Sequence, residues 1–144
     1  MIRMAEESDV QAICDLLKVA REESPFYSRF GYNELRTAAI LTNFIHNPKA
    51  IIFVDDDVDC VVVGEIIPDW LTDGFTASIH LAYAKPGVNG LKAINAFKTW
   101  ATGWPQVNKI FISSSFGGER ADAAGKLFER MGYDRLGSQY MGEL

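Results

Sequence analysis

Two strongly apolar runs around a short acidic turn constrain the fold of this chain more than any other feature of its sequence. Residues 50–54 (Ala-Ile-Ile-Phe-Val) and 59–67 (Asp-Cys-Val-Val-Val-Gly-Glu-Ile-Ile) are rich in β-branched side chains, and Asp55-Asp56-Asp57 lies between them. This pattern is typical of a β-hairpin. In residues 76–83 apolar and polar side chains alternate, which predicts a third strand beside the hairpin, with Ala77, Ile79, Leu81 and Tyr83 on one face.

Helical periodicity precedes and follows these strands. Ser8, with Gln11 three residues later, has the spacing of a capping box and predicts a helix start that leaves Asp9 exposed. The other expected segments are a strand at 2–4, helices at 8–22 and 33–46, a turn at 85–90 that opens a helix, a strand at 109–114, a helix at 121–131 that ends on Gly132, and extended chain at 133–141. The predicted order is βααβββαβαβ.

Composition limits the classes of function. With 144 residues and 48% apolar residues, one domain over residues 1–144 is expected. A net charge of −5 without a Lys or Arg block argues against binding to nucleic acid or to an anionic membrane. Cys14 and Cys60 lie in apolar surroundings without metal-ligand spacing, which predicts two buried thiols, no metal site and a reducing compartment. Without an N-terminal apolar segment, we expect a cytoplasmic protein.

The element order, together with segments 81–100 and 126–133, resembles the GNAT superfamily of N-acetyltransferases. Segment 126–133 (Lys-Leu-Phe-Glu-Arg-Met-Gly-Tyr) is similar to the end of that family's fourth helix, and the opening Ile-Arg-Met-Ala-Glu-Glu-Ser-Asp-Val is common in it. In its spacing and shortness the chain looks most like small acetyltransferases of phages and prophages. The resemblance implies an α/β (α+β) fold, with a mixed, mostly antiparallel, splayed central sheet flanked by about four helices.

The resemblance also implies acetyl-CoA as co-substrate, held between the fourth and fifth strands with its pyrophosphate on the loop before the third helix. Here that loop is Gly87-Val88-Asn89-Gly90-Leu91-Lys92. Glycines and a helix N-terminus suit phosphate because the backbone N–H groups can approach it closely. Of the family signature Gln/Arg-x-x-Gly-x-Gly/Ala only Gly90 matches, and Lys92 either supplies phosphate-directed charge or is a solvated lysine. The backbone of Leu81, Ala82 and Tyr83 would bind the pantetheine arm.

Catalytic residues are proposed from position. Imidazole exchanges protons near neutral pH, so His80 is the first candidate base, with a histidine packed under a helix as the alternative. Glu65 is a second candidate, since a carboxylate within a strong strand calls for a reason, although a solvent-facing strand residue is the usual one. Ser114, at the end of the fifth predicted strand, would contact cofactor or substrate unless it only forms the loop. Phe128 stands where the family often has a Tyr that protonates the CoA sulfur, and Phe cannot donate a proton.

The acceptor is expected beside aromatic loops, unless these loops form a satellite core. The candidate wall residues are Phe26, Tyr27, Phe30 and Trp70. The acidic side chains of Asp55, Asp56, Asp57, Asp69 and Asp73 would favour a cationic amine if they border the groove; otherwise they are solvated turn residues. A homodimer is compatible with a domain of this size, although no surface is specified.

Two functions follow from the resemblance. The first is an acetyl-CoA-dependent N-acetyltransferase, in which a primary amine of a small molecule or protein attacks the thioester directly. The alternative is a catalytically inactive GNAT-fold binding or structural module, which the incomplete loop signature and Phe128 favour. A dinucleotide-binding Rossmann domain is excluded because no Gly-x-Gly-x-x-Gly follows a first strand.

Overall fold

The computed structural model describes residues 1–113, 118–137 and 140–142. The chain divides into two compact units. The first unit comprises residues 1–20 and 32–113, and the second comprises residues 21–31 and 114–144. The prediction of one domain stays a prediction.

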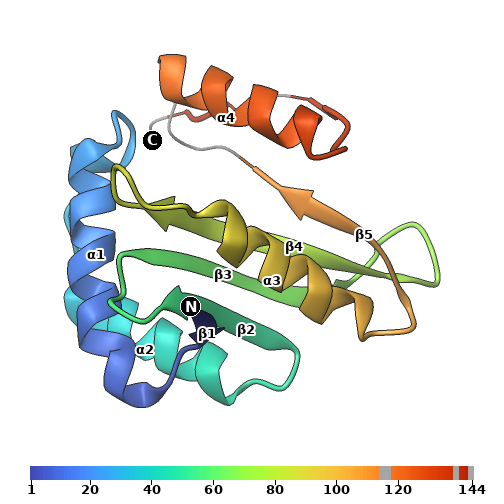
Figure 1. Ribbon diagram of the computed structural model, residues 1–144, viewed down its shortest axis with the longest axis horizontal. Coiled ribbons are helices and arrows are strands. Elements are labelled where there is room, and N and C mark those ends of the chain that lie inside the picture. The colour runs from blue at the N-terminus through green and yellow to red at the C-terminus, as the bar shows by residue number, and fades with distance from the viewer. Residues whose placement is uncertain (114–117, 138–139, 143–144) are drawn as a thin grey trace. The chain divides into compact units, whose positions relative to one another are not determined.

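The first unit is built on a five-stranded sheet with the strand order β1-β2-β3-β4-β5 (Figure 1). The three pairings from β1 to β4 are antiparallel, and β4 pairs with β5 in parallel. The strands are β1 (Ile2–Met4), β2 (Ala50–Asp55), β3 (Cys60–Pro68), β4 (Phe75–Ala84) and β5 (Val107–Ile112). The mixed, mostly antiparallel sheet confirms the predicted fold class, and the apolar runs of β2 and β3 form its buried centre.

Helices cover both faces of this sheet. They are the first part of α1 (Val10–Glu23), α2 (Glu34–His46), capped by Asn33, and α3 (Leu91–Thr102). Gly64 of β3 lies under Phe97 of α3. The next residue, Glu65, is hydrogen-bonded to His80, and the His80 ring meets Phe44 of α2 edge to face. Because neighbouring residues of a strand point to opposite faces, α2 and α3 lie on opposite sides of the sheet.

A β-bulge in β4 corrects the alternation expected for residues 76–83. Val63 pairs with Leu81, but the next β3 residue, Gly64, pairs with Ile79, so His80 has no register partner. A residue inserted in this way shifts the side-chain alternation of its strand. Leu81 therefore lies on the face of Ser78, opposite to Ile79, and Tyr83 shares that face through its pairing with Val61. The prediction of one common face for residues 77, 79, 81 and 83 is wrong beyond the bulge.

The start of the first helix also differs from the prediction. A 3₁₀ turn, η1 (Glu7–Asp9), precedes α1, and Asp9 rather than Ser8 satisfies its first backbone donor, because Asp9 Oδ2 accepts from the Glu6 N–H at 2.8 Å. Asp9 is buried, contrary to expectation, and pairs with both terminal nitrogens of Arg3 at 2.7 and 2.9 Å. This bidentate contact lowers the pKa of Asp9 to about 2 and ties β1 to the helix start.

The second unit contains the end of α1, a 3₁₀ turn, η2 (Tyr27–Arg29), and α4 (Gly118–Arg130). Gly132 has a φ of +89°, and the Tyr133 N–H donates to the Phe128 carbonyl, so the helix ends on the predicted glycine. Within 133–141, no strand is assigned among the described residues, so the last β of the predicted order is not found there.

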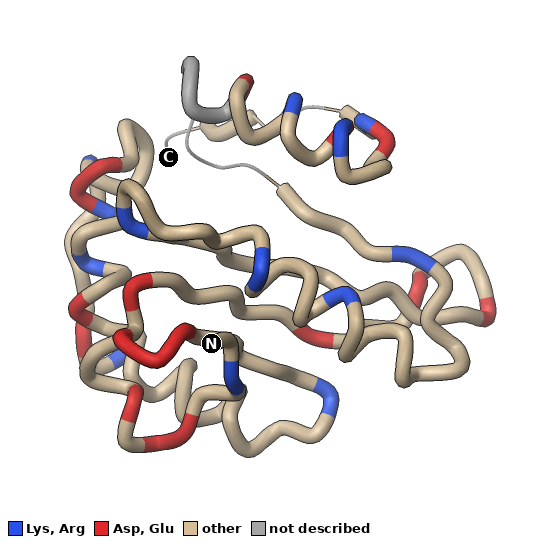
Figure 2. Tube along the Cα trace, in the orientation of Figure 1, with Lys and Arg blue, Asp and Glu red and all other residues tan. Residues whose placement is uncertain are grey.

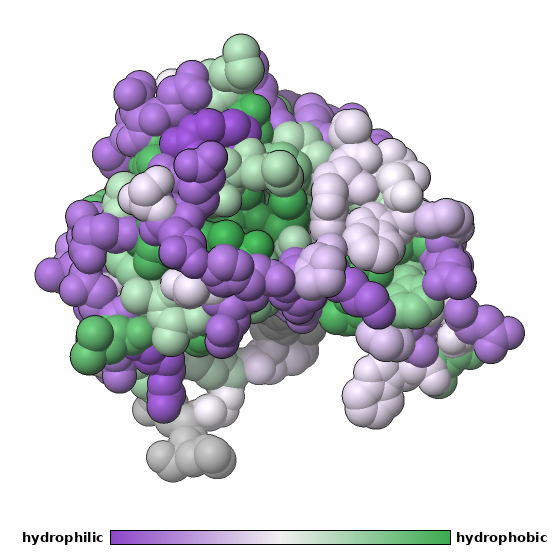
Figure 3. Space-filling view, turned by 90° about the horizontal axis from the view of Figure 1, so that it is seen from below, coloured by the Kyte–Doolittle hydropathy of each residue, from purple (hydrophilic) through white to green (hydrophobic). Residues whose placement is uncertain are grey.

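The surface carries mixed charge and scattered apolar residues. In the first unit acidic residues gather at the β2–β3 turn and along α1, without a basic patch (Figure 2). On the face shown in Figure 3, hydrophobic surface lies between hydrophilic residues. None of the helices in the described part of the chain has the length and apolar composition that a bilayer crossing requires.

Candidate active site

The sheet opens on one side of β4. The pairing between β4 and β5 runs from Phe75 to Ile79 and ends at Ile112, whereas β4 continues beside β3 to Ala84. Beyond Ile79 this edge of β4 therefore has no β5 partner among the described residues, and an extended ligand can pair there through main-chain groups. Leu81, Ala82 and the buried Tyr83, predicted to bind pantetheine, all lie in this segment.

His80 and Glu65 meet where β5 departs. His80 Nε2 lies 3.0 Å from Glu65 Oε1, and the Phe44 ring meets the imidazole edge to face with centroids 6.0 Å apart. The side chains of His80 and Glu65 are 42% and 28% exposed, so both are open to a ligand. With Nε2 donating to the carboxylate, Nδ1 carries the lone pair that can accept a proton. The structure thus joins two residues predicted separately.

Ser78 and Phe111 continue the same face of the sheet. The register aligns Glu65 of β3 with Ser78 of β4, and Ser78 with Phe111 of β5. Residues aligned in this way on adjacent strands share a face. Phe111 is 44% exposed, which leaves its ring available. We call the group formed by Phe44, Glu65, Ser78, His80 and Phe111 the His80 surface.

The loop after β4 ends at a helix N-terminus, as predicted. Gly90 caps α3, and Gly87 adopts a φ of +83°, which favours glycine. Within the described residues the backbone N–H groups of Gly87, Asn89 and Lys92 have no hydrogen-bond acceptor. Free N–H groups at a helix start fit a phosphate, so the loop is suited to the predicted pyrophosphate.

The side chains around this loop differ in their availability. Lys92 is exposed in the first turn of α3, whereas Lys85 pairs with Asp59. A Cβ placed on Gly90 would come within 2.9 Å of the Ala84 Cβ, so this glycine lets the loop approach β4 closely. Replacing Gly90 would therefore disturb the fold as well as any ligand, and Lys92 is the cleaner position for a test.

The remaining predicted site residues belong to three other segments of the chain. Ser114 lies outside the described residues. Trp70 projects from the β3–β4 loop and is 97% exposed. Phe26, Tyr27 and Phe30 belong to the second unit, where the Ser24 hydroxyl accepts from the backbone of residues 26 and 27. Their place in a substrate wall stays a prediction.

Most acidic turn residues have structural partners. Asp55 Oδ1 accepts the backbone N–H groups of Asp59 and Cys60, and Asp56 pairs with the N-terminal amine. Asp69 pairs with Lys109, which lowers the pKa of Asp69 to about 2. These contacts favour the interpretation of Asp55, Asp56 and Asp69 as turn-forming groups rather than an acceptor-binding cluster.

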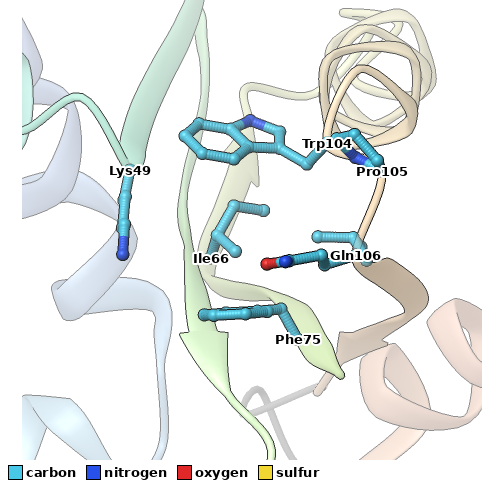
Figure 4. Close-up of a pocket in the computed structure, with 7 residues that line it drawn as sticks. Lys49, Ile66, Phe75, Trp104, Pro105 and Gln106 are labelled. Carbon is cyan, nitrogen blue, oxygen red and sulfur yellow. The ribbon is translucent and has the colours of Figure 1, made fainter. Parts of the chain in front are cut away.

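A small pocket of about 60 Å³ lies at the other end of the sheet (Figure 4). Trp104 and Phe75 flank Ile66 and Gln106, and the Lys49 amine lies 5.5 Å from the Phe75 centroid. Ile66 and Phe75 belong to the end of β3 and the start of β4, whereas the open edge begins after Ile79. The pocket is therefore separate from the His80 surface.

The cysteines do not contribute chemistry to this site. Cys14 and Cys60 are buried free thiols, which confirms the prediction. Burial raises the pKa of the Cys60 thiol to about 11 and that of Cys14 above its ordinary value, so both stay protonated and unreactive. No cluster of three His, Cys, Asp or Glu side chains suited to a metal occurs in the part of the chain that the structure describes.

Solved structures share this architecture over the whole chain. An aminoglycoside N-acetyltransferase in complex with CoA is similar with a TM-score of 0.75 and 12% identity, covering 100% of this chain and 93% of its own. A predicted acetyltransferase with acetyl-CoA from Clostridium acetobutylicum has a TM-score of 0.72 and 12% identity, and the match covers 99% of this chain and 95% of that one. An acetyltransferase of Trypanosoma brucei has a TM-score of 0.72 and 15% identity, and the match covers 100% of this chain and 99% of that one.

These similarities establish a GNAT-like fold. No family model matches the sequence, and no curated protein matches it. The neighbours give no support to the narrower resemblance to phage and prophage proteins. At such low identity the comparisons carry the fold alone, so reaction and substrate must be argued from the site.

Sequence reasoning missed two members of the His80 surface. Phe44 lies in a correctly predicted helix, and Phe111 in a correctly predicted strand, but neither has a sequence signal that distinguishes it from a core aromatic. The β4 bulge was missed as well, because the extra residue leaves no mark on the alternation of apolar and polar side chains. Phe111 joins the surface through the register of the sheet, and Phe44 joins it through the packing of α2 against His80.

Proposed function

We propose that this protein is an acetyl-CoA-dependent N-acetyltransferase that acts on a primary amine by direct attack. One observation carries the proposal: the His80–Glu65 pair lies at the residue where β5 separates from β4, directly beside an open strand edge. A ligand along that edge and a base at its start is the arrangement that amine acylation requires. Acetyl-CoA, when bound, would supply the reactive acetyl thioester.

The residues of this chain would divide the work of binding. Main-chain groups of Leu81 and Ala82 would pair with the pantetheine arm, and the free N–H groups of the loop after β4 would hold its phosphates. Lys92 would add positive charge at the same helix start. Gly87 is exposed, and no described atom lies within 4 Å of the position that a Cβ would take on it, so a ligand could approach the loop closely there.

His80 would act as the general base. With Nε2–H held by Glu65, Nδ1 would take a proton from the acceptor's ammonium group, so that the neutral amine could attack the thioester carbon and the CoA sulfur would leave. The carboxylate would fix the ring and stabilise its charged form. Glu65 is thus a positioning residue. Both cysteine thiols are buried and protonated, which supports direct attack rather than transfer through a cysteine.

The second candidate is a binding module that holds CoA without transferring acetyl groups. Phe128 favours it, because this residue lacks the hydroxyl that protonates the leaving sulfur in many relatives. Its neighbour Tyr133 lies 6.2 Å away between ring centroids, and the Tyr133 hydroxyl is buried without a hydrogen-bond partner among the described residues. Burial raises the pKa of Tyr133. Formation of an N-acetyl product distinguishes the two functions.

The test uses the two histidines of the chain as a matched pair. Each lies against a glutamate, His80 against Glu65 and His46 against Glu7, but only His80 is at the open edge. We expect His80→Gln to lower kcat by about 100-fold or more, the usual range for losing a general base. His46→Gln should leave kcat unchanged, with N-acetyl product measured by mass spectrometry. Equal rates for the two variants would remove His80 from the mechanism.

The location and the partners that we expect belong to the same proposal. We place the protein in the cytoplasm, where two free thiols persist in a reducing environment. A small molecule or a protein could present the amine, and nucleic acid and membranes are not expected as partners. Whether the chain forms a homodimer stays open as a prediction.

A further inference from the structure

The His80 surface combines apolar rings with a single available carboxylate. Phe44 contacts His80, and Phe111 presents a ring that is 44% exposed on the other side of Ser78. Glu65 and Phe111 lie on strands on either side of β4, so their backbones are about 10 Å apart, or two strand spacings. An amine held at His80 would thus place the rest of the acceptor over Ser78 and Phe111.

The charges near this surface favour one cationic group in the acceptor. Asp69, at the end of β3 beyond Glu65, is neutralised by Lys109 of β5. Glu65 is the only carboxylate within β3, β4 and β5, and no lysine or arginine pairs with it among the described residues. A polycation would find one counter-charge here and would have to desolvate its other charges near exposed rings.

We infer that the acceptor is a monoamine with an aromatic or apolar body, and not a polyamine or a polyhydroxylated aminosugar. This inference rests on the proposed function and names the substrate class of the same site. The amine would lie at His80 Nδ1, with Glu65 as the negative charge on the other side of the imidazole. The aromatic body would stack on Phe111, for which offset and edge-to-face packing is favourable. Neighbouring Ser78 would offer a hydroxyl between the two.

The experiment compares acetylation of four amines by the full-length protein. Phenethylamine represents the inferred class, ethanolamine keeps one charge without the ring, and spermidine and kanamycin carry several charges. We expect kcat/KM for phenethylamine to exceed that for each of the others by roughly tenfold or more. Phe111→Ser should remove most of this preference by raising KM for phenethylamine, while ethanolamine is unaffected. Leu35→Ser, at an 86% exposed position of α2, is the control and should keep the preference.

The other possible results contradict either the acceptor class alone or amine transfer as well. Preference for spermidine or kanamycin, or a preference for phenethylamine that survives Phe111→Ser, would overturn the acceptor class and leave N-acetyl transfer intact. Binding of acetyl-CoA without acetylation of any amine would overturn both the acceptor class and amine transfer. A thermal-shift titration with acetyl-CoA on the same samples detects binding without acetylation, because acetyl-CoA raises the melting temperature only of a protein that binds it.

Discussion

Gly64 shows how one residue fixes the packing between the sheet and a helix. A Cβ at this position would lie 2.4 Å from Cε2 of Phe97 and 2.6 Å from the Ser78 carbonyl oxygen. Phe97 is fully buried and cannot swing aside without opening the core. The glycine in the middle of β3 is therefore required by the close approach of α3, and the same approach keeps Glu65 turned to the other face.

We predict that Gly64→Ala lowers the free energy of unfolding by about 2–3 kcal/mol, because overpacking forces Phe97 or β4 to shift. Gly125→Ala is the control: in the interior of α4 no atom lies within 4 Å of its Cβ position, and alanine favours a helix by up to about 1 kcal/mol. Urea unfolding measures both. Equal stability of Gly64→Ala and the parent protein would show that α3 does not pack as described.

Asp9 gives a second prediction at this scale, one that depends on pH. Arg3 holds the pKa of Asp9 at about 2 in the folded state, below its ordinary value of 3.8. The pair therefore stabilises the fold fully above pH 4, and this contribution is lost as the pH falls from 4 to 2. We expect Asp9→Asn to cost about 1–2 kcal/mol at pH 7.

Chemical denaturation at several pH values tests this account of Asp9. The difference in the free energy of unfolding between Asp9→Asn and the parent protein should shrink below pH 4. A difference that stays constant down to pH 2 would show that ionisation of Asp9 plays no part. Asp15→Asn, at an exposed position of α1 that bonds only Gln11, is the control and should change stability little at any pH.

At the scale of elements, the sequence predicts most of the fold because its periodicities are strong. The hairpin around Asp55, the helix capped by Asn33 and the glycine that ends α4 all occur as expected. The misses have local physical causes: Asp9 rather than Ser8 satisfies the first helical turn, and an extra residue in β4 leaves no mark on hydrophobic alternation. Register between distant strands, which joins Phe111 to Glu65, is not written in local sequence.

The N-terminus of α3 carries the prediction for cofactor affinity. Lys92 is exposed in the first turn, beside the free N–H groups of the loop, whereas Lys98 is exposed on the same helix in a later turn. A phosphate at the helix start gains a charge-assisted contact only from the nearer lysine. We expect Lys92→Gln to raise the Kd for acetyl-CoA by about tenfold and Lys98→Gln to leave it unchanged. Calorimetric titration measures the Kd for acetyl-CoA of each variant. Equal Kd values for the two variants would show that Lys92 does not contribute to phosphate binding.

At the scale of the whole molecule, a GNAT-like fold has an open edge of β4 with the His80–Glu65 pair at its start. The first unit contains the open edge, the His80 surface and the loop before α3. The members of the His80 surface come from segments far apart in the sequence, and His80 is the extra residue of the β4 bulge beside Glu65. If this arrangement is a cofactor site, acetyl-CoA must stabilise the folded chain.

The most direct test is therefore a thermal-shift titration of the full-length protein with acetyl-CoA, with adenosine diphosphate as the weak-binding control. At about a hundred times Kd a ligand stabilises the fold by roughly 2.7 kcal/mol, a shift of roughly 5–10 °C for a domain of this size. We predict a shift in that range for acetyl-CoA, and a smaller one at equal concentration for Lys92→Gln. No shift at millimolar acetyl-CoA would contradict the cofactor site and the acetyltransferase function with it.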